Sequence, residues 1–250
     1  MVRTFLLIAV AGFLVSVVTL SLAVALAGPE AFRHGYAFTL GDHGWRWTSH
    51  NRVHWSDDGR HDGGPEATRD FAWAGGSSLN VSVPAEIEYV QADGPAKVTA
   101  TGPKDALDDL RVEDGRIHYA SDGDHNGKLT LVVTAPAVDD FTLDGAESLK
   151  ISGYRQEKLS VAVSGYGDVK ASGETRDATL TISGAGRADL AALKTRTARI
   201  EINGSGDATL APTDAAIIDI SGAGEANLLT NPPKLTTHIS GSGQIHQPGG

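Results

Sequence analysis

The chain has 250 residues, a formal net charge of −10 and no cysteine. This length allows one or two domains. The acidic balance argues against a nucleic-acid partner, because a nucleic-acid-binding surface needs a basic stripe. Without cysteine the chain has no disulfides, no thiol nucleophile and no thiolate metal site. Glycine is frequent, at 30 residues, and aromatic residues make up only 6%, which indicates many tight turns around a narrow core.

The N-terminus begins with an apolar run over residues 5–27, interrupted only by three hydroxyl-bearing side chains. The run is long enough to cross a bilayer as a helix, and Ala25-Leu26-Ala27 before Gly28 is typical of a signal-peptidase site. We expect residues 1–27 to be a cleaved signal peptide or a retained membrane anchor. Either alternative exports the rest of the chain to the periplasm or cell envelope.

Residues 28–76 are rich in Gly, His, Asp and Trp and have no sustained period. They are predicted to be a polar spacer, with one or two tryptophans docking on the following domain. Five of the nine histidines lie in this region, namely His34, His43, His50, His54 and His61. A histidine-rich tract can bind metal, but a solvated linker explains the same composition.

From residue 77 onward the pattern predicts β-strands. Alternating residues at 79–83, 97–101 and 128–134 predict strands, and Asp114-Gly115 between two short apolar segments predicts a hairpin. Residues 104–109 could form one helical turn. This part is less regular than the C-terminal half of the chain, as expected for the capped end of a repeat structure.

Six copies of one glycine-rich turn occupy the C-terminal half at intervals of 18 to 20 residues. They begin at Asp144, Ser164, Ser183, Asn203, Ser221 and Ser240. A period near 20 with alternating apolar residues predicts a β-solenoid. We therefore expect an all-β, single-domain solenoid over residues 77–246, with coils of about 19 residues and a short tail at 247–250.

The alternation around each turn predicts which residues face the interior. The turn glycines have the parity of the apolar residues and are expected to face inward, which indicates tight bends or a narrow interior. They are Gly145, Gly165, Gly167, Gly184, Gly186, Gly204, Gly206, Gly222, Gly224, Gly241 and Gly243. The outward positions are predicted to stack into two ladders. One comprises Ser164, Ser183, Asn203, Ser221 and Ser240, and the other Asp168, Arg187, Asp207, Glu225 and Gln244.

The chemistry of these ladders favours no reaction. Arg187 opposes a regular stack of calcium ligands, and the neighbouring Asp207 and Glu225 indicate either a bound cation or two solvated carboxylates. Asp168, Asp189, Asp207 and Glu225 provide no acid–base pair at a recognisable spacing. We predict no catalytic, metal-binding or cofactor-binding residue, and no cofactor.

Residues 79–244 resemble the putative auto-transporter adhesin, head GIN domain family. The resemblance rests on the repeated S-G-x-G turn and on Val132-Val133-Thr134-Ala135-Pro136 leading to Phe141-Thr142-Leu143-Asp144-Gly145. The first copy departs from the pattern, because Glu147 replaces its second glycine. The resemblance implies a right-handed, β-helix-like fold in an exported protein, and it implies no catalytic residues.

A stacked ladder offers a long, flat surface that suits extended partners. We expect a non-enzymatic envelope binding or scaffold protein, with adhesion as one such role. Envelope polysaccharide or a protein surface is the expected partner, and Tyr154 and Tyr166 are expected to point outward, where they could stack on sugars. Two alternatives are a sensing module anchored in the inner membrane by residues 5–27 and a polysaccharide-active enzyme.

Overall fold

The computed structural model describes residues 65–123, 125 and 127–249. The predicted signal or anchor segment and the five spacer histidines lie outside these residues. Within the described part, no helix is long and apolar enough to cross a membrane. Strands dominate this part, and all of them belong to one sheet that winds into a β-solenoid of about five turns, as the sequence predicts. The right-handed sense of the coil stays a prediction.

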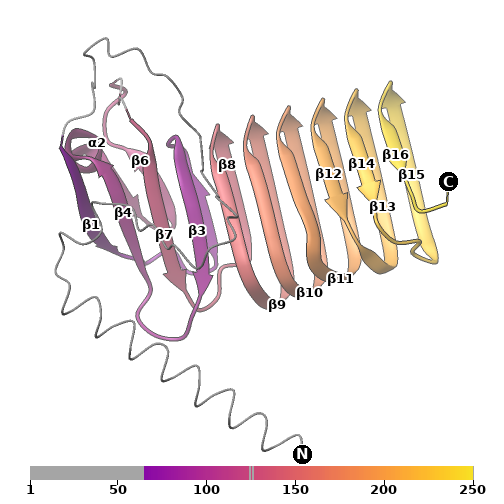
Figure 1. Ribbon diagram of the computed structural model, residues 1–250, viewed down its shortest axis with the longest axis horizontal. Coiled ribbons are helices and arrows are strands. Elements are labelled where there is room, and N and C mark those ends of the chain that lie inside the picture. The colour runs from indigo at the N-terminus through magenta and orange to yellow at the C-terminus, as the bar shows by residue number, and fades with distance from the viewer. Residues whose placement is uncertain (1–64, 124, 126, 250) are drawn as a thin grey trace, which may run out of the picture. The chain divides into compact units, whose positions relative to one another are not determined.

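Each coil of the solenoid has two sides joined by a bend (Figure 1), and from residue 140 onward each of these bends contains glycine. Side one is the strand segment that ends at the bend, and side two is the segment that comes after it. Successive coils pair in parallel, for example Leu180 with Val161 on side one and Val169 with Leu149 on side two. The strands of the stack are β8 (Asp140–Gly145), β9 (Ser148–Gly165), β10 (Asp168–Gly184), β11 (Arg187–Gly204), β12 (Asp207–Leu210), β13 (Pro212–Gly222), β14 (Glu225–Leu228), β15 (Lys234–Gly241) and β16 (Gln244–His246).

The core of the stack is built from rows of equivalent residues. Side one contributes large apolar side chains, including Val163, Ile182, Ile202 and Ile220, which are at most 1% exposed. The facing row on side two has small residues in three successive coils. In this row Val169 is followed by Ala188, Ala208 and Ala226. Large residues opposite small ones allow the two sides to pack closely around a thin interior.

The N-terminal end of the stack does not follow the order of the sequence. The first coil formed by the chain consists of β2 (Ser78–Val81) and β3 (Ala85–Gln91), and β8 and β9 pair with it on one side. The chain then makes a detour before β8, so that β6 pairs with β2 and β7 with β3 on the other side. The detour comprises β4 (Lys97–Pro103), α2 (Lys104–Asp109), β5 (Leu110–Glu113), β6 (Arg116–Tyr119) and β7 (Leu129–Ala135).

Several local predictions for this cap are confirmed. β5 and β6 form an antiparallel hairpin, and both Asp114 (φ 46°) and Gly115 (φ 82°) have the positive φ angles of a two-residue hairpin turn. The predicted helical turn is α2. Its Ala106 and Leu107 are buried, so the helix closes this end of the apolar interior.

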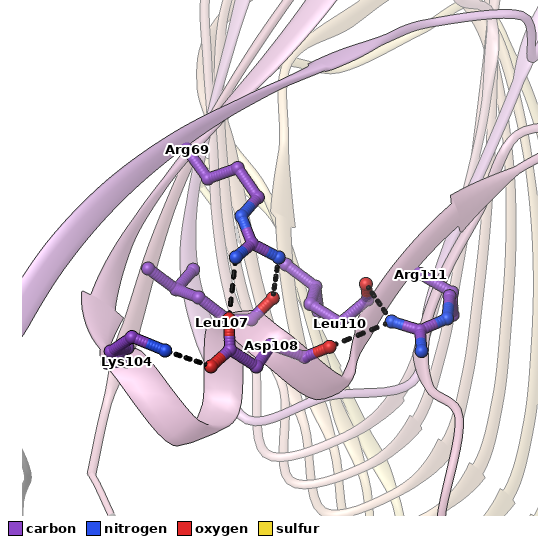
Figure 2. A network of polar contacts seen from close by, with 6 residues as sticks. All are labelled: Arg69, Lys104, Leu107, Asp108, Leu110 and Arg111. Carbon is purple, nitrogen blue, oxygen red and sulfur yellow. Dashed lines mark hydrogen bonds and ion pairs between the residues drawn. The ribbon is translucent and has the colours of Figure 1, made fainter.

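A polar network joins α2 to strand β1 (Glu66–Ala72) (Figure 2). Arg69 of β1 donates hydrogen bonds to the Leu107 carbonyl oxygen at 2.9 Å and to the Asp108 carboxylate at 2.6 Å. Lys104 also pairs with Asp108, and Arg111 donates to the carbonyl oxygens of Asp108 and Leu110. These contacts satisfy carbonyl groups that the C-terminus of a helix leaves without partners.

Strand β1 corrects the predicted spacer. It lies within residues 28–76, pairs antiparallel with β4 along its whole length, and is followed by Trp73, which is only 8% exposed. The spacer interpretation is therefore wrong for residues 66–73, although the docking of one tryptophan is confirmed. As an edge strand that buries little of either face, β1 lacks the alternation that identifies strands in a sequence.

Candidate binding surface

The glycine bends lie in line along one edge of the stack, where the arrowheads of β8, β9, β10, β11, β13 and β15 end in Figure 1. Backbone hydrogen bonds tie each bend to the one before it. The Ser205 amide donates to the Gly184 carbonyl oxygen at 2.8 Å and the Asp207 amide to the Gly186 carbonyl oxygen at 3.0 Å, and the neighbouring coils repeat both contacts. The bends therefore form a continuous, regularly spaced edge.

The two glycines of each bend have different roles, which corrects the expectation that both face inward. The second glycine is buried in four successive coils, at Gly167, Gly186, Gly206 and Gly224. The first glycine of the bend adopts a positive φ and packs against the backbone of the preceding coil. At Gly204, with φ of 135°, an added Cβ would lie 2.3 Å from the Gly184 carbonyl oxygen. Strict alternation fails here because the chain turns at this residue.

We define the bend surface as the two predicted ladders together with the crest residues between their glycines. On side one, register pairs Ser183 with Ser164 and Asn203, and Ser221 with Asn203 and Ser240. On side two it aligns Asp168, Arg187, Asp207, Glu225 and Gln244. All ten side chains are exposed or partly exposed. The crest carries Tyr166, Ala185, Ser205, Ala223 and Ser242.

The charges on side two form pairs rather than a site for a cation. The Arg187 guanidinium lies 3.3 Å from the Asp207 carboxylate. Glu225 accepts a hydrogen bond from Asn227 at 2.9 Å and lies 3.5 Å from His246. Within the described residues, no group of three or more His, Cys, Asp or Glu side chains could hold a metal ion. Exposed pairs of this kind contribute about 0–1 kcal/mol each to stability, so this ladder is a solvated mixed-charge surface.

The two tyrosines expected to point outward have opposite environments. Tyr166 at the crest is 76% exposed, whereas Tyr154 is fully buried. The Tyr154 hydroxyl lies 2.5 Å from the Lys158 carbonyl oxygen, and burial raises its pKa. The prediction is wrong for Tyr154 because Ser152 and Gly153 are both exposed. Two successive outward residues reverse the alternation at this bend, where Gly153 has a φ of 66°.

Glu147 occupies the position that the second glycine has in later coils. It is 2% exposed, and its Oε2 atom has no hydrogen-bond partner among the described residues. Burial raises the pKa of Glu147, the negative charge of Asp144 adds to this rise, and a hydrogen bond from its own backbone amide opposes it. This departure was visible in the sequence, but its burial was not.

The opposite edge of the stack, formed by the turns between side two and side one, contains an open hollow of about 780 Å³. It is lined by Arg155, Gln156, Glu157, Glu174, Thr175, Arg176 and Arg196. Its charges are mixed, and Arg196 is paired with Asp214 at 2.8 Å. No signal in the sequence identified this hollow. It provides neither a buried carboxylate pair nor a nucleophile with a base.

The stack of glycine bends, which follows an irregular N-terminal cap, places the protein in the class of β-solenoids. The model of the family described as "Putative auto-transporter adhesin, head GIN domain" matches residues 77–232. The chain belongs to this family. A search of curated proteins gave no match.

The chain is also similar to solved structures from two bacteria. A putative adhesin from Bacteroides fragilis aligns with a TM-score of 0.60 and 19% identity, over 73% of this chain and 97% of that one. A putative lipid-binding protein from Parabacteroides distasonis aligns with a TM-score of 0.46 and 18% identity, over 74% and 98% of the two chains. At this identity the Bacteroides fragilis likeness supports the fold alone.

Proposed function

We propose that the protein is exported to the cell envelope and acts there as a non-enzymatic binding module, whose bend surface holds an extended polysaccharide. The observation that carries this proposal is the in-register ladder of side-chain hydroxyl and amide groups on side one, from Ser164 to Ser240. Neighbouring strands are about 4.8 Å apart, so the ladder repeats hydrogen-bonding groups at a spacing comparable with one sugar unit.

The chemistry of the bend surface suits a glycan. Serine, asparagine and aspartate groups donate to and accept from sugar hydroxyls, and the exposed ring of Tyr166 offers an apolar face on which a sugar can stack. A repetitive surface gains affinity by engaging many equal units of an extended partner. The family description, a putative adhesin, supports a binding role.

A binding assay with immobilised envelope polysaccharides tests the proposal. Wild-type protein is compared with a Tyr166→Ala, Asn203→Ala double variant, and Glu174→Ala on the opposite edge is the matched control. We expect the double variant to lose binding on the order of tenfold or more while the control retains it. Absence of binding to every glycan, or equal loss in both variants, would contradict the proposal and favour a protein partner.

The mode of envelope attachment needs a separate test, because the segment that decides it lies outside the described residues. We propose that residues 1–27 are removed on export, since Ala25-Leu26-Ala27 precedes Gly28 as a signal-peptidase site would. N-terminal sequencing of the exported protein should begin at Gly28. A sequence beginning at Met1 would instead support the anchored sensing module.

A further inference from the structure

The C-terminal end of the solenoid leaves the interior of the stack open. Ile182, Ile202 and Ile220 are at most 1% exposed, but Ile239, the next residue of the same row, is 42% exposed. β15 pairs only with β13, and β16 only with β14, among the described strands. The outer edges of both strands therefore present backbone N–H and C=O groups next to exposed apolar side chains.

The two ends of the stack differ. At the N-terminal end, α2 covers the interior, and Leu107 and Leu110 are 1% exposed. An open strand edge with apolar side chains is a surface that native proteins usually cover, because it pairs readily with another strand. The C-terminal edge is not blunted by proline or charge at its inward positions, which are Leu235, Thr237 and Ile239.

The sequence of β15 is complementary to itself in antiparallel pairing. When two copies of β15 pair about Thr237, Leu235 of one copy lies opposite Ile239 of the other. Thr237 of one copy lies opposite Thr237 of the other. The apolar side chains of the two copies then lie side by side on the inward face of the joined sheet, where cross-strand contact stabilises the pairing. The same register places Lys234 opposite Ser240, so no lysine faces a lysine.

The lack of acidic residues at the C-terminal end of the solenoid also permits contact between two copies. Residues 234–250 contain no aspartate or glutamate, although the chain holds 31. Lys234 is the only lysine or arginine in this stretch. In the paired arrangement the two lysines stand about 20 Å apart at opposite ends of the strands. The approach of two chains of net charge −10 therefore brings no carboxylates together at the contact.

We propose that two copies of this chain associate through their C-terminal ends, by antiparallel pairing of β15 with β15 around a two-fold axis at Thr237. Such an interface is isologous and closes on itself, so it produces a dimer and not a filament. The two interiors become one continuous core, and the bend surfaces of the two copies lie on opposite edges of the joined stack, because antiparallel strands end at opposite edges. This inference goes beyond the proposed binding function and does not depend on it.

Because the chain has no native cysteine, a disulfide can form only at an introduced cysteine, and this makes a crosslinking test specific. Thr237→Cys in the full-length chain, produced in cells and oxidised in the isolated envelope fraction, places two thiols opposite each other, within the range of a disulfide after small adjustment. Ser240→Cys is the control on the same strand, where the two thiols stand about 20 Å apart. We expect Thr237→Cys to give on the order of tenfold more disulfide-linked dimer on a non-reducing gel.

A second variant separates the interface from chance collision. Ile239→Asp added to Thr237→Cys should abolish the crosslink, because it places a charge against the interior of the second copy, while circular dichroism shows the same β content. Equal crosslinking of Thr237→Cys and Ser240→Cys, survival of the crosslink in the presence of Ile239→Asp, or crosslinked bands only at the mass of another protein would each overturn the proposal.

Discussion

Glu147 lies one coil below Gly167 in the stack, where its carbonyl oxygen accepts a hydrogen bond from the Asp168 amide at 2.9 Å, just as the Gly167 carbonyl accepts one from the Arg187 amide. The backbone hydrogen bond between neighbouring bends is therefore present at this position although Glu147 replaces the glycine. Glu147 belongs to the coil that adjoins the cap, with β3 next to it. The position accommodates a side chain there, but the carboxyl group is buried.

Glu147→Gln should stabilise the protein at neutral pH. Burial and the charge of Asp144 raise the pKa of Glu147, so the folded state holds this proton more tightly than the unfolded state does. Its contribution to stability is complete below the unfolded pKa of about 4.3 and is lost as the pH rises through the folded pKa. We expect a gain on the order of 1 kcal/mol at pH 8.

Chemical unfolding of wild type and Glu147→Gln between pH 4 and pH 8 measures this effect. The stability difference between them should grow as the pH rises and should vanish near pH 4. A difference that is independent of pH would show that the carboxyl group is not kept protonated by its surroundings.

Gly204→Ala should disrupt the stacking of the bends. The new methyl group would lie 2.3 Å from the Gly184 carbonyl oxygen, so the coils would have to move apart. We expect a loss of about 2–4 kcal/mol in the free energy of unfolding.

The matched control for Gly204→Ala is Gly153→Ala. Gly153 also has a positive φ, but an added Cβ there meets no atom within 4 Å. It should cost only the conformational term, about 1 kcal/mol. Equal losses in the two variants, measured by urea unfolding, would mean that conformation and not coil contact requires glycine at the bend.

Substitution of the buried Tyr154 should reduce the stability of the fold, whereas substitution of the exposed Tyr166 should not. Tyr154→Ala removes a buried ring and should cost about 3–5 kcal/mol, as large aromatic truncations do. Tyr166→Ala removes a ring that is 76% exposed and should leave the melting temperature within about 1 °C of wild type. Thermal unfolding followed by circular dichroism measures both. A large drop for Tyr166→Ala would mean that the crest residue has a structural role.

Arg69→Met should loosen the cap without affecting the coils. Arg69 joins β1 to α2 through Asp108 and the Leu107 carbonyl group. Hydrogen exchange should therefore become faster in residues 66–72 and stay unchanged in β10 and β11. Acid should have a similar effect, because hydrogen bonds from Lys104 and Arg69 hold the pKa of Asp108 below its usual value, and this stabilisation is lost as the pH falls through that lowered pKa.

A different exchange pattern would contradict this prediction. If Arg69→Met accelerated exchange equally in β1, β10 and β11, the cap and the coils would open as one cooperative unit. Thr68→Ala, which removes a hydroxyl contact to Thr101 on the same strand pair, is the control for a change that does not reach α2.

The sequence by itself determined the repeat. The turn spacing predicts coils of about 19 residues, and the register of β9, β10 and β11 agrees with it, because each coil must return the chain to the same place in the stack. The alternation also predicts the two outward ladders, since side chains in a strand point to opposite faces in turn. The hairpin at Asp114-Gly115 was predictable from local turn chemistry alone.

Only the tertiary structure decided where local rules give way to contacts between distant segments. β6 and β7 lie before β2 and β3 in the stack, although they come after them in sequence, because the interior needs a cover at that end. Tyr154 is buried because the bend at Gly153 reverses the alternation. Glu147 is buried because the neighbouring coil closes over it, and Ile239 is exposed because, among the described strands, β15 pairs only with β13. Burial depends on which coil comes next, and a periodic sequence repeats the same residues whether or not that neighbour is present.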